Sequence, residues 1–141
     1  MKRINIAITG GLGKMGQKII NSSKKDKKFK ITSITESKVL NKKVSGLKLQ
    51  INSKNAFKDA QVIIDFSVPK CTLAILKIAS SLKKKVVIGT TGFSNKEEKL
   101  IKKYSRKIPI LKAGNMSLGV NLLVYLTEIA SKSLGNNFLS K

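Results

Sequence analysis

The stretch that most constrains the fold is "INIAITGGLGKMGQKI", residues 4–19, where an apolar run passes directly into a cluster of glycines. The run Ile4–Thr9 is short, apolar and rich in β-branched residues, which is typical of a buried strand. Four glycines then fall within seven residues, and Gly13 to about Ser23 has the apolar spacing of a helix. Glycine is costly inside regular structure. The cluster therefore predicts a tight turn that leads from a strand into a helix.

The rest of the chain continues this alternation of strand and helix patterns. Strands are predicted at Phe29–Thr35, Val62–Phe66, Val86–Ile88 and Ile108–Ala113, with a further short strand near Leu47–Ile51 in the weakly patterned segment 37–61. Helices are predicted from Pro69 through Thr72–Leu82, at Lys96–Lys107 and at Gly119–Leu134, with Asn136-Asn137 beyond the last one. Strands that alternate with helices form βαβ units. We expect an α/β fold: a Rossmann-type parallel sheet with helices on both faces.

The charge balance admits two interpretations. The chain has 29 Lys and Arg against 7 Asp and Glu, a formal net charge of +22. One interpretation is an anionic partner such as nucleic acid or a phosphorylated ligand. The other is a lysine-rich solvated surface. Arg occurs only at positions 3 and 106 and aromatic residues make up 5% of the chain, whereas readers of nucleic acid use arginine forks and aromatic stacking. This favours the solvated surface, and we expect no nucleic-acid partner.

Several residue types that carry chemistry are missing. The chain has no histidine and a single cysteine, Cys71, so we expect no metal site and no internal disulfide. The apolar start is interrupted too early by glycines for a signal peptide. The late apolar run Leu118–Ala130 is shorter than the roughly 20 residues that span a bilayer. We therefore expect a cytoplasmic protein without a membrane contact, and we expect Cys71 to be a small buried apolar residue.

Gly10, Gly13 and Gly16 form G-x-x-G-x-x-G, a variant of the dinucleotide-binding fingerprint. In that motif the turn lets the backbone approach a pyrophosphate at the N-terminus of a helix. A ribose-binding acid is expected about 20 residues later, at the end of the second strand, and Glu36 lies there. The alternatives are an ordinary strand-to-helix turn and a surface carboxylate. An acid at this place favours NAD, whereas the nearby Lys38 would suit NADP, so the coenzyme is NAD or NADP.

Four segments together go beyond a generic nucleotide fold: "GGLGKMGQ", "DFSVPKCT", "VIGTTGF" and "AGNMSLGVN". In order and spacing they resemble the 4-hydroxy-tetrahydrodipicolinate reductases (dihydrodipicolinate reductases), and the resemblance covers essentially the whole chain. It implies that the pyrophosphate lies against Gly10, Gly11, Leu12, Gly13, Lys14 and Met15 and that Glu36 binds the adenine ribose. It also implies a nicotinamide pocket formed by Gly89, Thr90, Thr91, Ala113, Gly114, Asn115 and Met116, bordered by Phe66 and Ser67.

The resemblance also implies an activity and a domain organisation. The family reduces 4-hydroxy-tetrahydrodipicolinate, a dicarboxylate, to tetrahydrodipicolinate with NADH or NADPH, in lysine and diaminopimelate biosynthesis, and tends to form homotetramers. Its His-His-x-x-Lys stretch and Gly-Thr pair, which bind and protonate the substrate, have no counterpart here. We therefore expect residues 1–116 to be the dinucleotide-binding domain and residues 117–141 the start of a truncated substrate and oligomerisation domain, with no catalytic residue and no turnover.

Two other classes of protein remain open from the residues alone. The first is a non-catalytic basic module that binds nucleotides or nucleic acid, which the charge would suit. The second is another two-domain dehydrogenase with the same nucleotide fold, against which "GTTGF" and "AGNMSLGVN" argue.

Overall fold

A six-stranded parallel sheet forms the centre of the protein. The computed structural model describes residues 2–38 and 41–134. The strands of the sheet are β1 (Ile4–Thr9), β2 (Phe29–Glu36), β5 (Gln50–Ile51), β6 (Val62–Asp65), β7 (Lys85–Ile88) and β8 (Ile110–Lys112). Their spatial order is β5-β2-β1-β6-β7-β8, and every neighbouring pair is parallel. Counted along the chain, this is the order 3-2-1-4-5-6 of the Rossmann fold, so the predicted fold class is confirmed.

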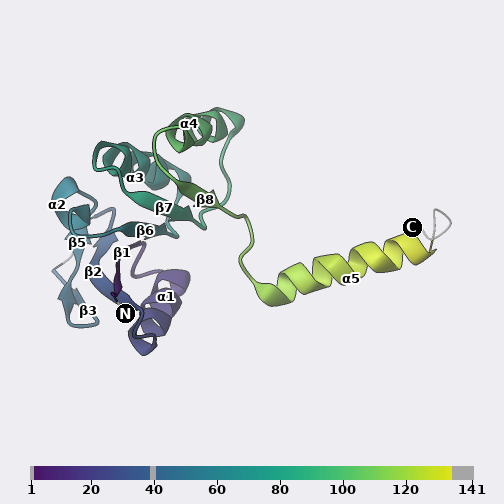
Figure 1. Cartoon of the computed structure of the whole chain (residues 1–141), viewed down its shortest axis with the longest axis horizontal. Coiled ribbons are helices and arrows are strands. Elements are labelled where there is room, and N and C mark those ends of the chain that lie inside the picture. Colours follow the sequence, from purple (N-terminus) through teal and green to yellow (C-terminus); the bar gives the residue numbers. More distant parts are fainter. Residues whose placement is uncertain (1, 39–40, 135–141) are drawn as a thin grey trace.

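Helices cover the two faces of this sheet unequally (Figure 1). The helices are α1 (Lys14–Lys25), α2 (Lys54–Phe57), α3 (Pro69–Ser81), α4 (Asn95–Ser105) and α5 (Leu118–Leu134). Helix α1 packs on β1 and β2, while α3 and α4 pack against each other on the opposite face. On the face that carries α1, no described helix lies over β8, where Leu111 is 62% exposed.

Two apolar cores follow from the alternation of side chains along the central strands. On the α1 face, Ile6 and Ile8 pack with Ile20 of α1 and Ile34 of β2. On the other face the core is larger and joins β6 and β7 to α2, α3 and α4; its buried residues are Ala7, Ala56, Phe57, Ala60, Ile63, Ile75, Leu76, Ala79, Val86, Ile88, Ile101 and Ile108. Together these cores fix the strands whose ends form the candidate site.

The weakly patterned segment 37–61 differs most from the prediction. In place of one short strand, the structure has β3 (Lys43–Val44), β4 (Leu47–Lys48) and β5. Strands β3 and β4 form an antiparallel hairpin, and its turn residues Ser45 and Gly46 have φ of 58° and 81°. Strand β5 turns away and pairs with β2 at the edge of the main sheet.

Other predicted boundaries shift by one or two residues, and at α4 a capping box fixes the start. Helix α4 begins after the cap residue Ser94, one residue before the predicted start, and ends at Ser105. Strand β8 is shorter than predicted at both ends. Helix α3 starts at Pro69, as the proline predicts. The predicted helix exit at Asn136-Asn137 lies outside the described residues.

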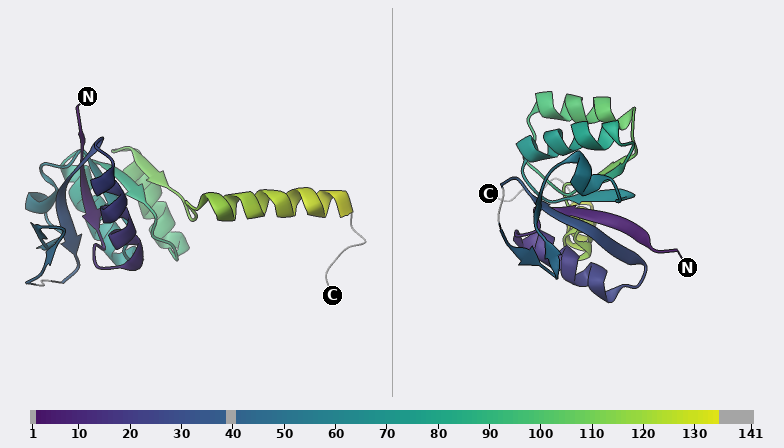
Figure 2. Two further views of the ribbon diagram at one scale, coloured as in Figure 1. Left: turned by 90° about the horizontal axis from the view of Figure 1, so that it is seen from below. Right: turned by 90° about the vertical axis from the view of Figure 1, so that its left-hand side faces the viewer.

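Helix α5 extends away from the sheet and its covering helices (Figure 2). None of its residues is buried. Across residues 2–38 and 41–134, no helix has the length and apolar character needed to cross a membrane.

Candidate functional site

The loops that follow β1 and β6 meet where the strand order reverses. Strands β1 and β6 are neighbours, but the strand that follows β1 lies on one side and the strand that follows β6 on the other. In open parallel sheets, ligands bind in the crevice that this reversal opens beyond the carboxyl ends of the strands. The glycine loop after Thr9 and the loop after Asp65 flank that crevice.

The glycine loop is held by backbone hydrogen bonds and by close packing. The N–H groups of Gly10 and Gly11 donate to the carbonyl of Thr35 at 3.0 and 3.3 Å, and the Gly13 N–H donates to the Gly10 carbonyl at 3.0 Å. Gly10 has φ of +68°, and a Cβ there would lie 2.5 Å from the carbonyl oxygen of Phe66. A Cβ on Gly16 would collide with the Gly10 carbonyl. The glycines therefore let this turn pack against both α1 and the β6 loop.

The start of α1 offers backbone donors to a ligand. Gly13 caps the helix without a side-chain bond, and the first turn contains no acidic residue. The first intrahelical bond runs from the Gln17 N–H to the Gly13 carbonyl at 3.0 Å. The N–H groups of Lys14, Met15 and Gly16 precede that bond, as at any helix start. Such an end carries a partial positive charge and suits a phosphate.

Glu36 is tied directly to the glycine loop. It ends β2 and is half-buried, and its Oε1 accepts a hydrogen bond from the Leu12 N–H at 2.8 Å. Its other oxygen, Oε2, makes no hydrogen bond within the described part of the chain. The neighbouring Thr35 hydroxyl donates to Asn52 Oδ1 at 2.6 Å, and the Asn52 N–H donates to the Glu36 carbonyl at 3.3 Å. The carboxylate is thus fixed beside the loop with one oxygen available.

Two pockets lie at this edge of the sheet. The first, here called the Glu36 pocket, has a volume of about 240 Å³ and is lined by Gly10, Gly13, Glu36, Ser37, Asn52, Phe66, Ser67, Val68 and Cys71. The second, here called the Asn115 pocket, has a volume of about 290 Å³ and is lined by Met15, Phe66, Gly89, Ala113, Gly114, Asn115, Met116 and Ser117.

Phe66 is the residue that the two pockets share. Its backbone carbonyl lies against Gly10, and its ring occupies the space that a side chain on Gly89 would need. One aromatic side chain therefore borders both pockets, and Gly89 must stay without a Cβ for the ring to lie there.

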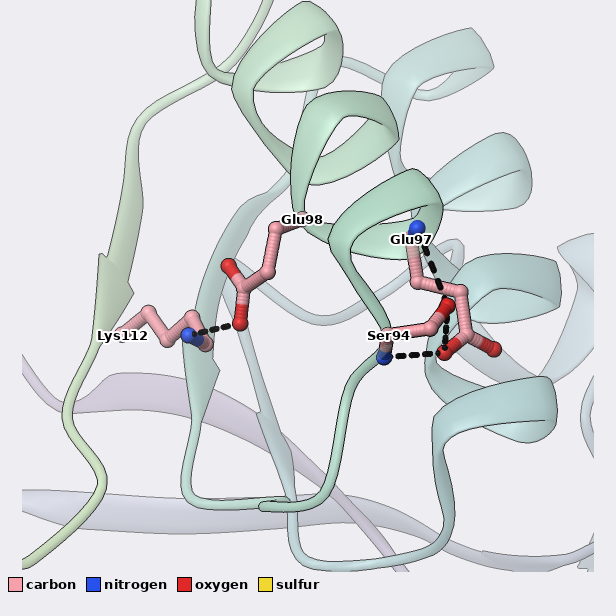
Figure 3. A network of polar contacts seen from close by, with 4 residues as sticks. All are labelled: Ser94, Glu97, Glu98 and Lys112. Carbon is pink, nitrogen blue, oxygen red and sulfur yellow. Dashed lines mark hydrogen bonds and ion pairs between the residues drawn. The ribbon is translucent and has the colours of Figure 1, made fainter.

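The loop that forms the far wall of the Asn115 pocket is anchored at both ends. Before it, Lys112 pairs with Glu98 of α4 at 2.6 Å (Figure 3), and its ammonium lies 5.3 Å from the centre of the Phe93 ring. At the other end of the loop, the Asn115 side chain accepts a hydrogen bond from the Ser117 N–H at 2.9 Å and donates one to Asn121 of α5 at 2.7 Å. The Asn115 side chain thus turns the chain into α5.

The structure brings most of the predicted site residues together. Gly10, Gly13, Met15, Glu36, Gly89, Ala113, Gly114, Asn115 and Met116 line one pocket or the other. The remaining five predicted residues line neither pocket. Gly11 is buried under Ile34, and Leu12 contributes its N–H to Glu36. Thr90 is 4% exposed and its hydroxyl faces Asp65.

The other two, Lys14 and Thr91, are exposed. Asn52, Ser37 and Val68 line the Glu36 pocket without having been predicted. Asn52 comes from the weakly patterned segment, where no motif marks it.

The expected burial of Cys71 is only partly correct, because this residue is half-buried, packs against the larger core and also lines the Glu36 pocket. No group of three or more potential metal ligands occurs among the residues that the structure describes.

The strand order and the glycine loop at its reversal define a Rossmann-type α/β domain. A family model described as dihydrodipicolinate reductase, N-terminus, matches residues 4–116. The chain therefore belongs to the dihydrodipicolinate reductase family, and the resemblance seen in its sequence is confirmed.

Curated relatives support the same assignment. The 4-hydroxy-tetrahydrodipicolinate reductase of Pelagibacter ubique is 67% identical over 141 residues, which cover 100% of this chain and 55% of the relative. The reductase of the same name from Buchnera aphidicola subsp. Schizaphis graminum is 38% identical over 148 residues, covering 96% of this chain and 54% of the relative. The chain spans about half the length of the curated relatives it matches.

A solved structure shares the fold. The dipicolinate-bound dihydrodipicolinate reductase from Paenisporosarcina sp. TG-14 superimposes with a TM-score of 0.73 over 91% of this chain and 53% of that one. Their sequences are 18% identical, so this similarity concerns the fold alone.

Proposed function

We propose that the chain binds a reduced nicotinamide coenzyme, NADH or NADPH, across the Glu36 and Asn115 pockets. The observation that carries the proposal is the bond between Glu36 and the Leu12 N–H, which places a half-buried carboxylate at the rim of the glycine loop. A ribose hydroxyl would donate to the available oxygen of Glu36. The pyrophosphate would lie against the glycine loop and the start of α1, and the nicotinamide would lie in the Asn115 pocket beyond Phe66.

The residues present fit such a coenzyme. A Cβ at Gly10 would collide with the Phe66 carbonyl and a Cβ at Gly16 with the Gly10 carbonyl, so the glycines allow the tight turn that a pyrophosphate-binding loop requires. No side chain caps α1, so its first N–H groups are available to phosphate oxygens. The Asn115 pocket is mostly apolar with a few amide and hydroxyl groups, which suits an aromatic carboxamide ring. When bound, the coenzyme supplies hydride.

The activity proposed for the whole protein is the reduction of 4-hydroxy-tetrahydrodipicolinate to tetrahydrodipicolinate, in lysine and diaminopimelate biosynthesis. Within it, residues 1–116 are proposed as the coenzyme-binding domain and residues 117–141 as the start of the domain for substrate binding and homotetramer formation. The described residues that line the Asn115 pocket include no titratable side chain. The chain as given is therefore expected to hold and orient the coenzyme but not to protonate a substrate.

Calorimetric titration of the chain with NADH and with NADPH tests the proposal. Binding of either coenzyme is expected, and Glu36→Gln should weaken NADH binding by roughly tenfold, the equivalent of about 1.4 kcal/mol, because it removes a charged acceptor for the ribose. Glu128→Gln, an exposed carboxylate on α5, is the matched control and should bind as the parent chain does. Absence of heat with both coenzymes at high protein concentration would contradict the proposal.

The same titration decides between the two coenzymes. Glu36 favours the free ribose hydroxyl of NADH, whereas a 2′-phosphate would have to approach a carboxylate. Lys38 is exposed two residues further on and is a cation that would attract that phosphate. Equal affinities would indicate dual use.

The only cysteine of the chain gives an independent readout. Cys71 lines the Glu36 pocket, so bound coenzyme should slow its reaction with a maleimide. The reaction rate should fall as NADH is added and should not change when NADH is added to Glu36→Gln at the same low concentration.

A basic surface supports a second candidate function, non-catalytic binding of nucleic acid. At the opposite, amino-terminal edge of the sheet, Arg3, Lys24, Lys27 and Lys30 surround a pocket of about 340 Å³ together with Asp26. A gel shift with duplex and single-stranded oligonucleotides tests it. Binding that disappears at ~200 mM salt, while NADH still binds, would indicate a non-specific electrostatic contact.

A further inference from the structure

A buried carboxylate that the coenzyme site does not use lies directly beneath it. Asp65 ends β6 in the middle of the sheet and is 0% exposed. The ion pairs of residues 2–38 and 41–134 are Lys112–Glu98 and Lys132–Glu128, so no described cation neutralises Asp65. A buried carboxylate without a cation is costly unless its oxygens accept hydrogen bonds.

Four hydroxyl groups meet this requirement. Thr9 and Ser67 donate to Oδ1 at 2.5 and 2.6 Å. Thr72 and Thr90 donate to Oδ2, the latter at 3.3 Å. A carboxylate can only accept, so each hydroxyl must use its single proton here. The Thr90 oxygen is then free to accept, and it accepts from the Ser67 N–H at 3.0 Å.

Three of these donors lie at the end of β1 or in the loops after β6 and β7, and the fourth, Thr72, lies on α3. Thr9 directly precedes Gly10 of the glycine loop, Ser67 follows Phe66, and Thr90 follows Gly89. Two successive hydrogen bonds, from the Ser67 N–H to the Thr90 hydroxyl and from that hydroxyl to Asp65, tie the β6 loop to the β7 loop. The bond from Thr9 to Asp65 connects the end of β1 to them. Gly10, Phe66 and Gly89, which line the two pockets, are thus each adjacent to a residue that Asp65 holds.

We propose that Asp65 is a positioning residue of the coenzyme site: by collecting hydroxyl donors from the end of β1 and from the loops after β6 and β7, it fixes Phe66 and Thr90 relative to the glycine loop. This inference rests on the proposed function, because the loops that Asp65 fixes are those proposed to hold the coenzyme. Asp65 acts through these residues and, being fully buried, does not itself touch the coenzyme.

Three substitutions separate positioning from a merely structural role. Asp65→Asn replaces one accepting oxygen by an NH₂ group, which cannot accept from the two hydroxyls that face it. Thr90→Val removes the hydroxyl that links the β6 and β7 loops. Thr72→Val is the matched control, because Thr72 is buried and donates to the same carboxylate but lies on α3 and lines neither pocket.

The first readout needs no coenzyme. Amide hydrogen exchange of Ser67, followed by NMR, reports directly on its bond to Thr90. We expect exchange to be at least about tenfold faster in Asp65→Asn and Thr90→Val, and unchanged in Thr72→Val, because a tenfold change corresponds to the roughly 1.4 kcal/mol of a single hydrogen bond.

The second readout compares NADH with ADP-ribose, which lacks the nicotinamide. Thr90→Val should weaken NADH binding by about tenfold and ADP-ribose binding by less, because it frees only the Ser67 N–H at the Glu36 pocket, whereas Asp65→Asn should weaken both, since it also releases Thr9. Thr72→Val should bind both ligands like the parent chain, even if it unfolds at a lower temperature.

The inference is overturned if Ser67 exchange is unchanged in both Asp65→Asn and Thr90→Val, or if Thr72→Val and Thr90→Val lose NADH affinity equally. If Asp65→Asn does not fold, Thr90→Val and its control decide alone. If the parent chain binds neither coenzyme, the proposed function is overturned, and Ser67 exchange by itself decides whether Asp65 positions the loops.

Discussion

Gly10 combines two constraints that exclude a side chain. Its φ of +68° lies in the left-handed region, which costs other residues about 1–2 kcal/mol, and a Cβ would lie 2.5 Å from the Phe66 carbonyl oxygen. Gly46 shares the first constraint, with φ of +81°, but nothing lies within 4 Å of its Cβ position. The two glycines therefore allow backbone strain to be separated from close packing.

We predict that Gly10→Ala lowers the free energy of unfolding by more than Gly46→Ala does. Gly46→Ala should cost about 1–2 kcal/mol, and Gly10→Ala at least about 1 kcal/mol more, because the β6 loop must also move. Urea unfolding of both variants measures the difference, and NADH titration should show a loss of affinity for Gly10→Ala alone. Equal costs and equal affinities would mean that the contact with Phe66 is not needed.

Among single residues, the sequence predicted the candidate site residues that directly follow a strand or a motif. It missed those that long-range strand pairing brings to the site. Glu36 could be placed because it lies at a fixed distance after the glycines and at the end of a clear strand. Asn52 could not, because it reaches the site through the pairing of β5 with β2. The role of Asp65 was hidden for the same reason, since three of its four hydroxyl donors come from Thr9, Thr72 and Thr90, which lie at least seven residues away along the chain.

At the scale of single elements, the start of α4 has a complete capping box. The Ser94 hydroxyl accepts from the Glu97 N–H at 3.4 Å, while the Ser94 N–H and hydroxyl both donate to Glu97 Oε2 at 2.8 Å (Figure 3). The Ser94 backbone N–H, and then its hydroxyl, lower the pKa of the Glu97 carboxyl from its ordinary value. The folded state thus binds this proton less readily than the unfolded state.

We predict a pH-dependent contribution of this capping box to stability. Because the folded pKa of Glu97 is lowered, its contribution is complete above the ordinary value of 4.5 and is lost as the pH falls through the lower folded value. A double-mutant cycle of Ser94→Ala and Glu97→Gln, measured by urea unfolding, should give a favourable coupling at neutral pH that declines in acid below pH 4.5. A coupling that does not change with pH would contradict this.

Elements with strong local signals were placed well, and the remainder depended on tertiary pairing. Pro69 marked the start of α3, and the β-branched runs marked the central strands. Strands β3, β4 and β5 have two residues each, which is too short for alternation to be visible. The hairpin turn at Ser45-Gly46 carries a recognisable serine-glycine signal, but its partners could not be assigned without the fold.

For the molecule as a whole, the apolar surface is distributed unevenly. The cores lie around β1, β6 and β7, whereas Leu111 of β8 and the whole of α5 are open to solvent in the described chain. On α5 the exposed apolar side chains are Leu118, Val120, Leu122, Leu123, Val124, Tyr125, Leu126, Ile129 and Leu134. They surround the helix, so this surface is not that of an ordinary amphipathic helix.

We predict that the chain as given self-associates through α5. Contiguous exposed apolar surface of this kind favours association, although the net charge of +22 opposes it at low salt. Sedimentation velocity should therefore show mass that rises with protein concentration and more steeply with added salt, because salt screens the repulsion. Replacing Leu122, Leu126 and Ile129 together by Gln should reduce association without altering the NADH affinity, since none of these residues lines either pocket. Replacing Ser131 and Ser133 by Gln on the same helix is the control that should associate like the parent chain. A chain that stays monomeric at high protein and high salt would show that the apolar surface of α5 does not drive association.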